Sequence, residues 1–298
     1  FQRDKIDPDK QIDNFRKVMA VTAEKFTDGS VTAPIVYVAW PENAVPLLAE
    51  RPGYLDAIAN FLPPNAILLT GSVRRDEIGG KLRYYNSMLV VADVSATMQP
   101  DLPAQAIEAG LFRQRAAIAS YDKTHLAPFG EYLPLAGLLR AVGLAQLAPF
   151  DEGFTPGTGP QTLDLGATKM APNICYETVF PGTLYPKSDR PDWLLTVTND
   201  AWFGDNAGPK QHLDQARLRA IETGLPFFRS ANTGISAAID PYGRVLKSVP
   251  LYQEGAIVAA LPVAAAPPLY TKLGDLPYGL LLLGLGFAGR RKMTQTGN

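Results

Sequence analysis

Short apolar runs bounded by turn-forming residues recur along this chain and predict β-strands. In most of them the side chains are apolar on both faces, which indicates sheets that are covered on both sides by helices or by another sheet. The predicted strands occupy residues 33–40, 65–73, 85–93, 169–176, 192–199, 235–240 and 256–262.

Helical periodicity fills several of the gaps between these strands. Apolar residues recur on one face of segment 9–26, and further helices are predicted at 53–61 and 209–224. Strands that alternate with helices predict a layered α/β fold. No repeat of fixed period and no long linker divides the chain, so we expect one domain over residues 1–270 and a tail at 271–298.

The tail has a pattern of its own. Residues 276–289 are uncharged and rich in leucine, and Arg290, Arg291 and Lys292 follow at once. As a helix this run reaches about 21 Å, which is less than the roughly 30 Å of a bilayer core. Two readings stay open: an apolar helix packed on the core, or a membrane helix with a positively charged flank.

Composition narrows the range of functions. The 298 residues are 46% hydrophobic and 19% charged, as in an ordinary globular protein, and 28 basic residues balance 29 acidic ones. Nothing in this charge balance attracts nucleic acid. One cysteine and two distant histidines do not have the spacing of a zinc site, and no motif announces a cofactor, so we expect neither a metal nor a cofactor.

Three reactive side chains are expected at the ends of strands, where loops hold functional groups on a rigid scaffold. Glu42 comes after a buried-looking run and is either a partly desolvated general base or a carboxylate at the start of a helix. Lys123 opens a loop and either stabilises an oxyanion or is simply solvated. Cys175 is either a nucleophile or a small buried side chain without reactivity.

Taken together, the order Glu42, Lys123, Cys175 resembles the catalytic triad of the nitrilase (carbon–nitrogen hydrolase) superfamily. The resemblance is sharpest to one branch, the bacterial apolipoprotein N-acyltransferases, and extends from about residue 33 to the tail. The segments that carry it are WPEN (40–43), KTHLAPFGEYLP (123–134), ICYE (174–177), NDAWFG (199–204) and QHLDQARLRAIETGLPFFRSANTGISAAIDPYG (211–243).

The resemblance implies a nitrilase-like four-layer α-β-β-α sandwich for residues 1–270. It also implies a C-terminal transmembrane helix with a basic tail at 271–298, and a location at the bacterial inner membrane with the catalytic domain on the periplasmic side. Family members carry several membrane helices and a first core strand ahead of this region. We therefore expect the chain to be a truncated and weakly active form of such an enzyme.

The implied reaction is an acyl transfer through a thioester. Cys175 would take an acyl chain from a phospholipid, and the α-amino group of the diacylglyceryl-modified cysteine at an apolipoprotein N-terminus would then receive it. Glu42 would accept the protons. Lys123 and the backbone N–H of Tyr176 would hold the oxyanion.

Other residues are expected to support these groups. Glu131 would orient Lys123 or Glu42, and Glu177 would tune Cys175, although each could be a structural loop carboxylate. Trp202 and Phe203 would line the substrate entrance or else pack in the core. On the helix at 209–224, we interpret His212 as a solvent-facing or merely supporting residue, as we do its neighbours Asp214 and Arg217.

Two other functions stay open from the sequence. The first is a soluble amidase or nitrilase that hydrolyses a small carbon–nitrogen substrate with the same triad. The second is a non-enzymatic domain that binds lipid or lipoprotein.

Overall fold

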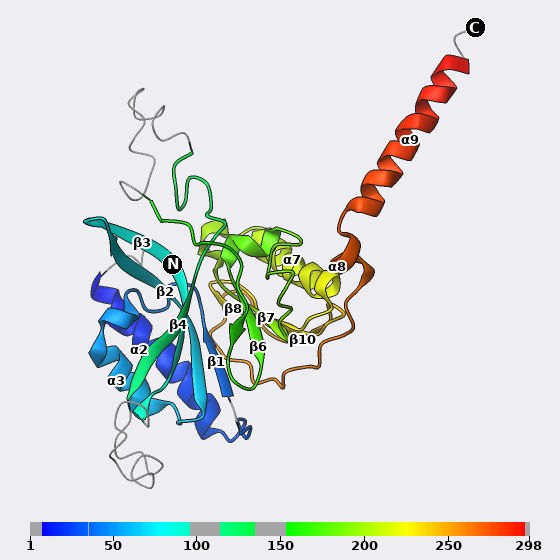
Figure 1. Ribbon diagram of the computed structural model, residues 1–298. Coiled ribbons are helices and arrows are strands. Elements are labelled where there is room, and N and C mark those ends of the chain that lie inside the picture. Colours follow the sequence, from blue (N-terminus) through cyan, green and yellow to red (C-terminus); the bar gives the residue numbers. More distant parts are fainter. Residues whose placement is uncertain (1–7, 35, 96–113, 135–152, 296–298) are drawn as a thin grey trace.

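The computed structural model describes residues 8–34, 36–95, 114–134 and 153–295 of the chain (Figure 1). Its helices are α2 (Pro8–Thr27), α3 (Pro52–Phe61), α7 (Gly208–Thr223), α8 (Leu269–Leu273) and α9 (Leu276–Gln295), with short 3-10 helices η1 (Leu48–Glu50), η3 (Cys175–Val179) and η4 (Asp200–Phe203). Its strands are β1 (Val36–Trp40), β2 (Ala66–Ile78), β3 (Lys81–Asp93), β4 (Arg115–Asp122), β5 (Leu163–Asp164), β6 (Lys169–Ile174), β7 (Trp193–Asn199), β8 (Phe227–Asn232), β9 (Ser236–Ile239) and β10 (Val245–Val249).

Within the described ranges these strands form two sheets. The four-stranded sheet has the order β1-β2-β3-β4, in which β1 and β2 are parallel and the other pairs are antiparallel. The six-stranded sheet has the order β10-β9-β8-β7-β6-β5, and its central strands β6, β7 and β8 run parallel. Parallel neighbours place the ends of β6 and β7 at the same edge, which is where their connecting loops meet.

The two sheets pack face to face, and helices cover their outer sides (Figure 1). Side chains that alternate along one strand show this directly: Leu68 faces α2 and α3, whereas its neighbour Leu69 faces the other sheet. In the same way Leu194 packs toward α7 and Leu195 toward the four-stranded sheet. The layers are therefore α-β-β-α, as the sequence predicts.

The predicted helices are confirmed to within about a residue at each end. In α2, Phe15 lies on the buried face, and its ring packs edge-on against Trp40 and Tyr54 at centroid distances of 6.1 and 4.5 Å. Helix α7 ends at Gly224, whose φ of 65° closes the helix in the left-handed region that glycine tolerates best. These helices bury the outer faces of the two sheets.

One predicted strand is wrong. Residues 256–262 adopt no regular secondary structure, although the segment is apolar. Its apolar character has another cause, because the segment runs over the domain surface and packs Leu261 against the core between the sheets. Conversely, the search for apolar runs missed strands β4, β8 and β10, because each contains polar or charged residues that interrupt its apolar run.

The C-terminal helix α9 projects away from the domain (Figure 1). Leu280 and Leu283 are 60% and 73% exposed, so the interpretation as a helix packed on the core is wrong for these residues. The predicted membrane span is not supported either, because among the described residues no helix combines the length and the apolarity that crossing a membrane requires. The uncharged part of α9 is short, and Arg290, Arg291 and Lys292 continue the same helix.

Candidate active site

The three reactive side chains follow strands, of which those before Glu42 and Cys175 were predicted from apolar runs and β4, before Lys123, was not. Glu42 comes two residues after β1, Lys123 directly after β4, and Cys175 directly after β6. The first two belong to the four-stranded sheet and the third to the six-stranded sheet. The packing of the sheets therefore brings together groups that are far apart in the sequence.

The turn that carries Glu42 lies against strand β2 at Gly71. A Cβ atom at this position would overlap the Glu42 Cα atom and would lie 2.7 Å from the Asn43 nitrogen, so no larger residue fits without displacing the turn. The Glu42 side chain is turned inward, and the residue is 4% exposed. Glycine at position 71 thus allows the acid to approach the sheet closely.

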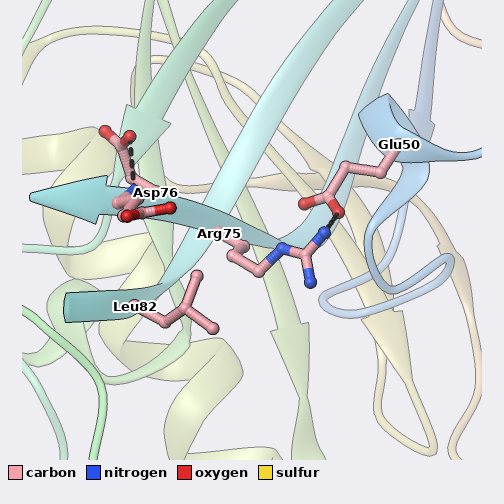
Figure 2. Close-up of a pocket in the computed structure, with 5 residues that line it drawn as sticks. Glu50, Arg75, Asp76 and Leu82 are labelled. Atoms are coloured by element: carbon pink, nitrogen blue, oxygen red, sulfur yellow. Dashed lines mark hydrogen bonds and ion pairs between the residues drawn. The ribbon is translucent and has the colours of Figure 1, made fainter. Parts of the chain in front are cut away.

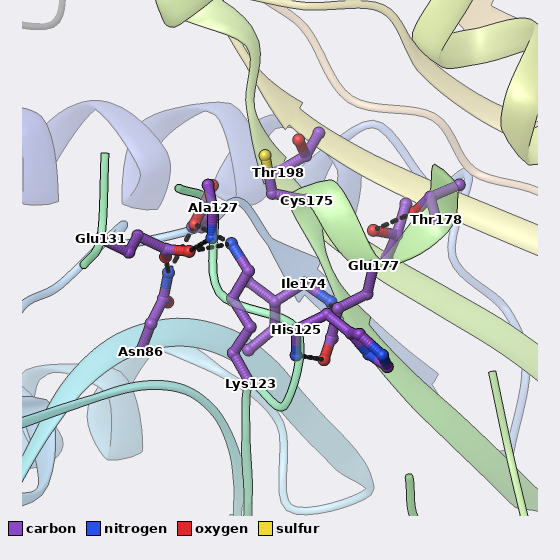
Figure 3. A network of polar contacts seen from close by, with 12 residues as sticks. Asn86, Lys123, His125, Ala127, Glu131, Ile174, Cys175, Glu177, Thr178 and Thr198 are labelled. Carbon is purple, nitrogen blue, oxygen red and sulfur yellow. Dashed lines mark hydrogen bonds and ion pairs between the residues drawn. The ribbon is translucent and has the colours of Figure 1, made fainter. Parts of the chain in front are cut away.

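Lys123 is buried, with a side chain that is 1% exposed, and it lies between two carboxylates. Its Nζ is 2.8 Å from Glu131 Oε2 and 3.9 Å from Glu42 Oε1. The amide nitrogen of Asn86 joins the same two acids, since it donates to Glu42 Oε1 at 2.7 Å and to Glu131 Oε1 at 2.6 Å (Figure 3). The ammonium group is therefore held on two sides and cannot be a solvated surface lysine.

Backbone contacts fix the loop between Lys123 and Glu131. The Lys123 N–H donates to the Asn86 carbonyl at 2.8 Å, and the Gly157 N–H donates to the Lys123 carbonyl at 2.8 Å. At the other end of the loop, the Phe154 N–H donates to the Glu131 carbonyl at 2.8 Å. The segment that returns after residue 152 thus supports both ends of the lysine loop.

Cys175 occupies the junction between β6 and η3, with a φ of 49°. This left-handed conformation is unfavourable for a residue with a side chain by roughly 1 kcal/mol or more, and such strain is concentrated at functional sites. Its sulfur atom lies beside Thr198 on the six-stranded sheet, on the side where the Lys123 ammonium group ends (Figure 3). Cys175 is half-buried.

Glu177 links the cysteine turn to the lysine loop. Its buried carboxylate accepts hydrogen bonds at 2.7–3.2 Å from the Tyr121 hydroxyl, the Thr124 N–H and hydroxyl, the His125 N–H and, at 2.8 Å, the Ile174 N–H. Four of these hydrogen bonds end at Oε1 and one ends at Oε2. These contacts support the interpretation of Glu177 as a structural carboxylate, which holds the two loops in register.

The charges of the site act on one another. The pKa of the Cys175 thiol is raised to about 12, first by burial and next by the negative charge of Glu42, and Lys123 offsets part of this effect. Burial alone would lower the pKa of Lys123, but the attraction of Glu42, Cys175 and Glu131 outweighs it, and the pKa is raised. The resting site therefore pairs a neutral thiol with a charged lysine.

Of the two interpretations of His212, the solvent-facing one is wrong. The residue is 4% exposed, and its Nε2 lies 3.1 Å from the Cys175 carbonyl oxygen while its Nδ1 lies 2.9 Å from Asp200 Oδ1. Helical periodicity does not reveal Asp200, the buried acid in η4 that draws this histidine inward. Asp214 and Arg217 do lie at the surface.

Trp202 and Phe203 belong to η4 and are 60% and 40% exposed, so the alternative interpretation as plain core packing is wrong. The Phe203 ring contacts the edge of His212 at a centroid distance of 5.7 Å. Tyr176 is half-buried beside the cysteine, with its ring packed edge-on against Phe180 at 5.0 Å. Tyr176 thus lies next to Cys175, and Phe203 packs on the histidine that contacts the Cys175 carbonyl.

A separate surface depression at the β2–β3 hairpin contains none of these residues (Figure 2). In this depression the Arg75 guanidinium is already paired with Glu50, and Leu82 is one of the lining residues. In the part of the chain that the structure describes, no group of acidic, histidine or cysteine side chains is arranged to hold a metal ion. The candidate chemistry therefore lies at the sheet interface.

Curated proteins with similar sequences share one name. The chain is 42% identical over 262 residues to the apolipoprotein N-acyltransferase of Bradyrhizobium diazoefficiens. The aligned region covers 86% of this chain and 45% of the relative. It is 40% identical over 248 residues to the protein of the same name from Rhodopseudomonas palustris, which covers 82% of this chain and 42% of that protein. The chain thus spans less than half the length of these two relatives.

Solved structures share the fold at much lower identity. An amidase from Nesterenkonia sp. superposes with a TM-score of 0.53 at 17% identity, covering 91% of this chain and 90% of the amidase. A family model described as carbon-nitrogen hydrolase matches residues 12–268, a range that holds Glu42, Lys123 and Cys175 as well as both sheets. With a match over most of its length, the chain belongs to the carbon-nitrogen hydrolase family.

Proposed function

We propose that this chain is the nitrilase-like catalytic domain of an apolipoprotein N-acyltransferase. It would transfer an acyl chain from a phospholipid to the α-amino group of the N-terminal diacylglyceryl-cysteine of an apolipoprotein, the last step of bacterial lipoprotein maturation. The observation that carries the proposal is the buried Lys123 ammonium group, 3.9 Å from Glu42 and on the side where the Cys175 sulfur lies (Figure 3), in a chain that is 42% identical to a protein of that name.

In the first step, the Cys175 sulfur attacks the ester carbonyl of the phospholipid. The C–S bond forms, the thiol proton passes to Glu42, and collapse of the tetrahedral intermediate breaks the ester C–O bond. The lysophospholipid leaves as an alcohol that takes the proton back from Glu42. Lys123 and the Tyr176 N–H stabilise the oxyanion before it collapses.

The raised pKa of Cys175 explains why a base is needed. With a pKa of about 12, roughly one thiol in 10⁵ would be ionised at pH 7, since each pH unit changes the ratio tenfold. A preformed thiolate therefore contributes little, and proton removal by Glu42 has to accompany attack on the carbonyl. Glu131 and Asn86 serve this step by holding Lys123 and Glu42 in place.

In the second step, the α-amino group attacks the thioester. The C–N bond forms, the C–S bond breaks, and the proton of the amine passes through Glu42 to the departing sulfur. Trp202 and Phe203, which are exposed on η4, are proposed to contact the acyl chain or the lipopeptide. Two substrates that react in turn at one sulfur predict ping-pong kinetics.

The proposed acyl donor is a membrane lipid. The proposal therefore includes that the domain works at the periplasmic surface of the bacterial inner membrane. The exposed leucines of α9 support contact with an apolar phase, because monomeric soluble domains rarely expose such a large apolar patch.

Intact-mass measurement tests the first step. After incubation with phospholipid in mixed micelles, the chain should gain the mass of one acyl group, and a diacylated lipopeptide should then remove it. The variant Cys175→Ser should show no thioester, because the serine hydroxyl is a much weaker nucleophile. For Lys123→Ala we expect acylation to slow by about 100-fold or more, the effect of losing an oxyanion donor.

A second experiment distinguishes the proposed acyltransferase from the alternative, a soluble amidase. Release of ammonia from small amides, without any acyl adduct from phospholipid, would contradict the proposal and favour hydrolysis. An acyl adduct that survives in Cys175→Ala would also contradict it, since the acyl group would then be held at another residue.

A further inference from the structure

His212 contacts the nucleophile through the backbone and not through the sulfur. Its Nε2 lies 3.1 Å from the carbonyl oxygen of Cys175, in a buried position on α7. A carbonyl oxygen can only accept a hydrogen bond, so Nε2 must carry the proton in this contact. The imidazole therefore acts as a donor toward the peptide group that joins Cys175 to Tyr176.

The other ring nitrogen is held by a buried ionic network. Nδ1 lies 2.9 Å from Asp200 Oδ1 and 3.1 Å from Arg229 Nη2, and Arg229 also pairs with the second oxygen of Asp200. The Arg229 Nε donates in turn to the Ile235 carbonyl at 3.0 Å. The ring is thus fixed between a carboxylate that is itself anchored and the carbonyl of Cys175.

The geometry of the peptide group gives this contact a consequence for catalysis. The bond between Cys175 and Tyr176 is trans, so its C=O and N–H point in opposite directions in one plane. A donor that holds the carbonyl on the α7 side therefore aims the Tyr176 N–H to the opposite side. That N–H is the backbone donor proposed above for the oxyanion, and a hydrogen bond to the carbonyl also polarises it.

We propose that His212 is a positioning residue for the oxyanion site: its Nε2–H holds the Cys175–Tyr176 peptide so that the Tyr176 N–H faces the reacting carbonyl. The inference rests on the proposed role of Cys175 as nucleophile. It extends that role by assigning a function to the Asp200–His212–Arg229 network. The left-handed φ of 49° at Cys175 makes such support necessary, because this conformation is unfavourable without it.

Two reactions of the same sulfur test the inference. Acylation by p-nitrophenyl butyrate passes through an oxyanion, whereas alkylation by iodoacetamide displaces iodide from carbon and forms none. Cys175 is the sole cysteine in the sequence, so the mass increase in both reactions reports on this residue. We expect His212→Asn to slow acylation by about tenfold to 100-fold while alkylation changes by less than about twofold.

The variant His212→Gln is the matched comparison. A glutamine amide nitrogen reaches about as far as Nε2 and can still donate to the Cys175 carbonyl, whereas the asparagine amide ends near Nδ1. Acylation should therefore be largely retained in His212→Gln. Equal losses of acylation and alkylation in both variants would mean that His212 only maintains the fold, and unchanged acylation in His212→Asn would overturn the inference.

A spectroscopic measurement on unaltered His212 tests the inference even if the His212 variants do not fold. In a ¹⁵N-labelled His125→Gln chain, His212 is the one remaining histidine. Its Nε2 should carry a slowly exchanging, hydrogen-bonded proton, and an unprotonated Nε2 would overturn the inference. Acylation by p-nitrophenyl butyrate without any adduct from phospholipid would instead contradict the proposed acyl donor and leave the role of His212 intact.

Discussion

The side-chain amide nitrogen of Asn86 donates a hydrogen bond of 2.7 Å to Glu42 Oε1. The same nitrogen donates to Glu131 at 2.6 Å, so one neutral residue spaces two acids on either side of Lys123. Because an amide donates where a carboxylate would repel, Asn86 holds Glu42, the proposed base, beside a second acid.

Replacing this amide by an acid should disable the site. In Asn86→Asp a third carboxylate would face Glu42 and Glu131, which would either protonate one of them or displace Lys123. We expect thioester formation to slow by about 100-fold, the scale of a lost general base. Asn60→Asp, an exposed change on α3, is the control and should leave the rate unchanged; a similar rate in both variants would contradict this role of Asn86.

The alkylation of Cys175 should depend on pH in a characteristic way. Because the pKa is raised to about 12, the rate with iodoacetamide should rise about tenfold per pH unit from pH 7 to 10 without a plateau. The charge of Glu42 raises this pKa and Lys123 lowers it. Glu42→Gln should therefore speed alkylation at pH 8 although acyl transfer falls about 100-fold, whereas Lys123→Met should slow alkylation. Shifts of the same sign in the two variants would refute the assigned electrostatics.

The Glu177 carboxylate should matter for stability more than for chemistry. In Glu177→Gln the amide group would have to face either the Ile174 N–H or the donors around Thr124, so one buried donor would lose its partner. We expect a loss of about 1–3 kcal/mol in the free energy of unfolding, measured with urea. Glu254→Gln, which removes an exposed ion pair with Lys17, should change it by less than about 1 kcal/mol. Equal effects would show that the network around Glu177 is not held tightly.

A methyl group at position 71 should displace the turn of Glu42. Gly71→Ala places a Cβ against the backbone of residues 41–43, and we expect a loss of about 1–3 kcal/mol of stability from overpacking together with slower thioester formation. Gly53→Ala is a matched control in α3, since a Cβ there meets no atom within 4 Å. Wild-type rates in Gly71→Ala would mean that Glu42 tolerates a shift of its backbone.

The positions of the reactive side chains could largely be predicted from the sequence, because these side chains come just after strands. Apolar runs before Glu42 and Cys175 mark buried strands, and the chain leaves the sheet at both places. The helices could be predicted equally well, because an apolar face such as that of residues 9–26 shows in the local spacing of apolar residues. The layered α/β class follows from this alternation, whereas the α-β-β-α layer order was implied by the family resemblance.

The rest depends on contacts that no local pattern contains. Asn86 looks like a polar residue in an ordinary strand, and its role becomes visible when the loop carrying Glu131 folds over it. Arg229 and Asp200 are buried because each neutralises the other, although their side chains alone predict exposure. His212 is buried with them because its Nδ1 contacts Asp200. A charged residue inside an apolar segment such as FFRSAN is the signal that could have pointed to this network.

The division of the site between two sheets has a mechanical consequence. Glu42 and Lys123 move with one sheet and Cys175 with the other, and the sheets are kept in register by the apolar layer that contains Leu69 and Leu195 together with the hydrogen bonds of Glu177. A displacement of an ångström in that layer would pull the acid and the sulfur out of alignment long before the protein unfolds. Interior methyl groups far from Cys175 thus set how precisely the candidate site is aligned.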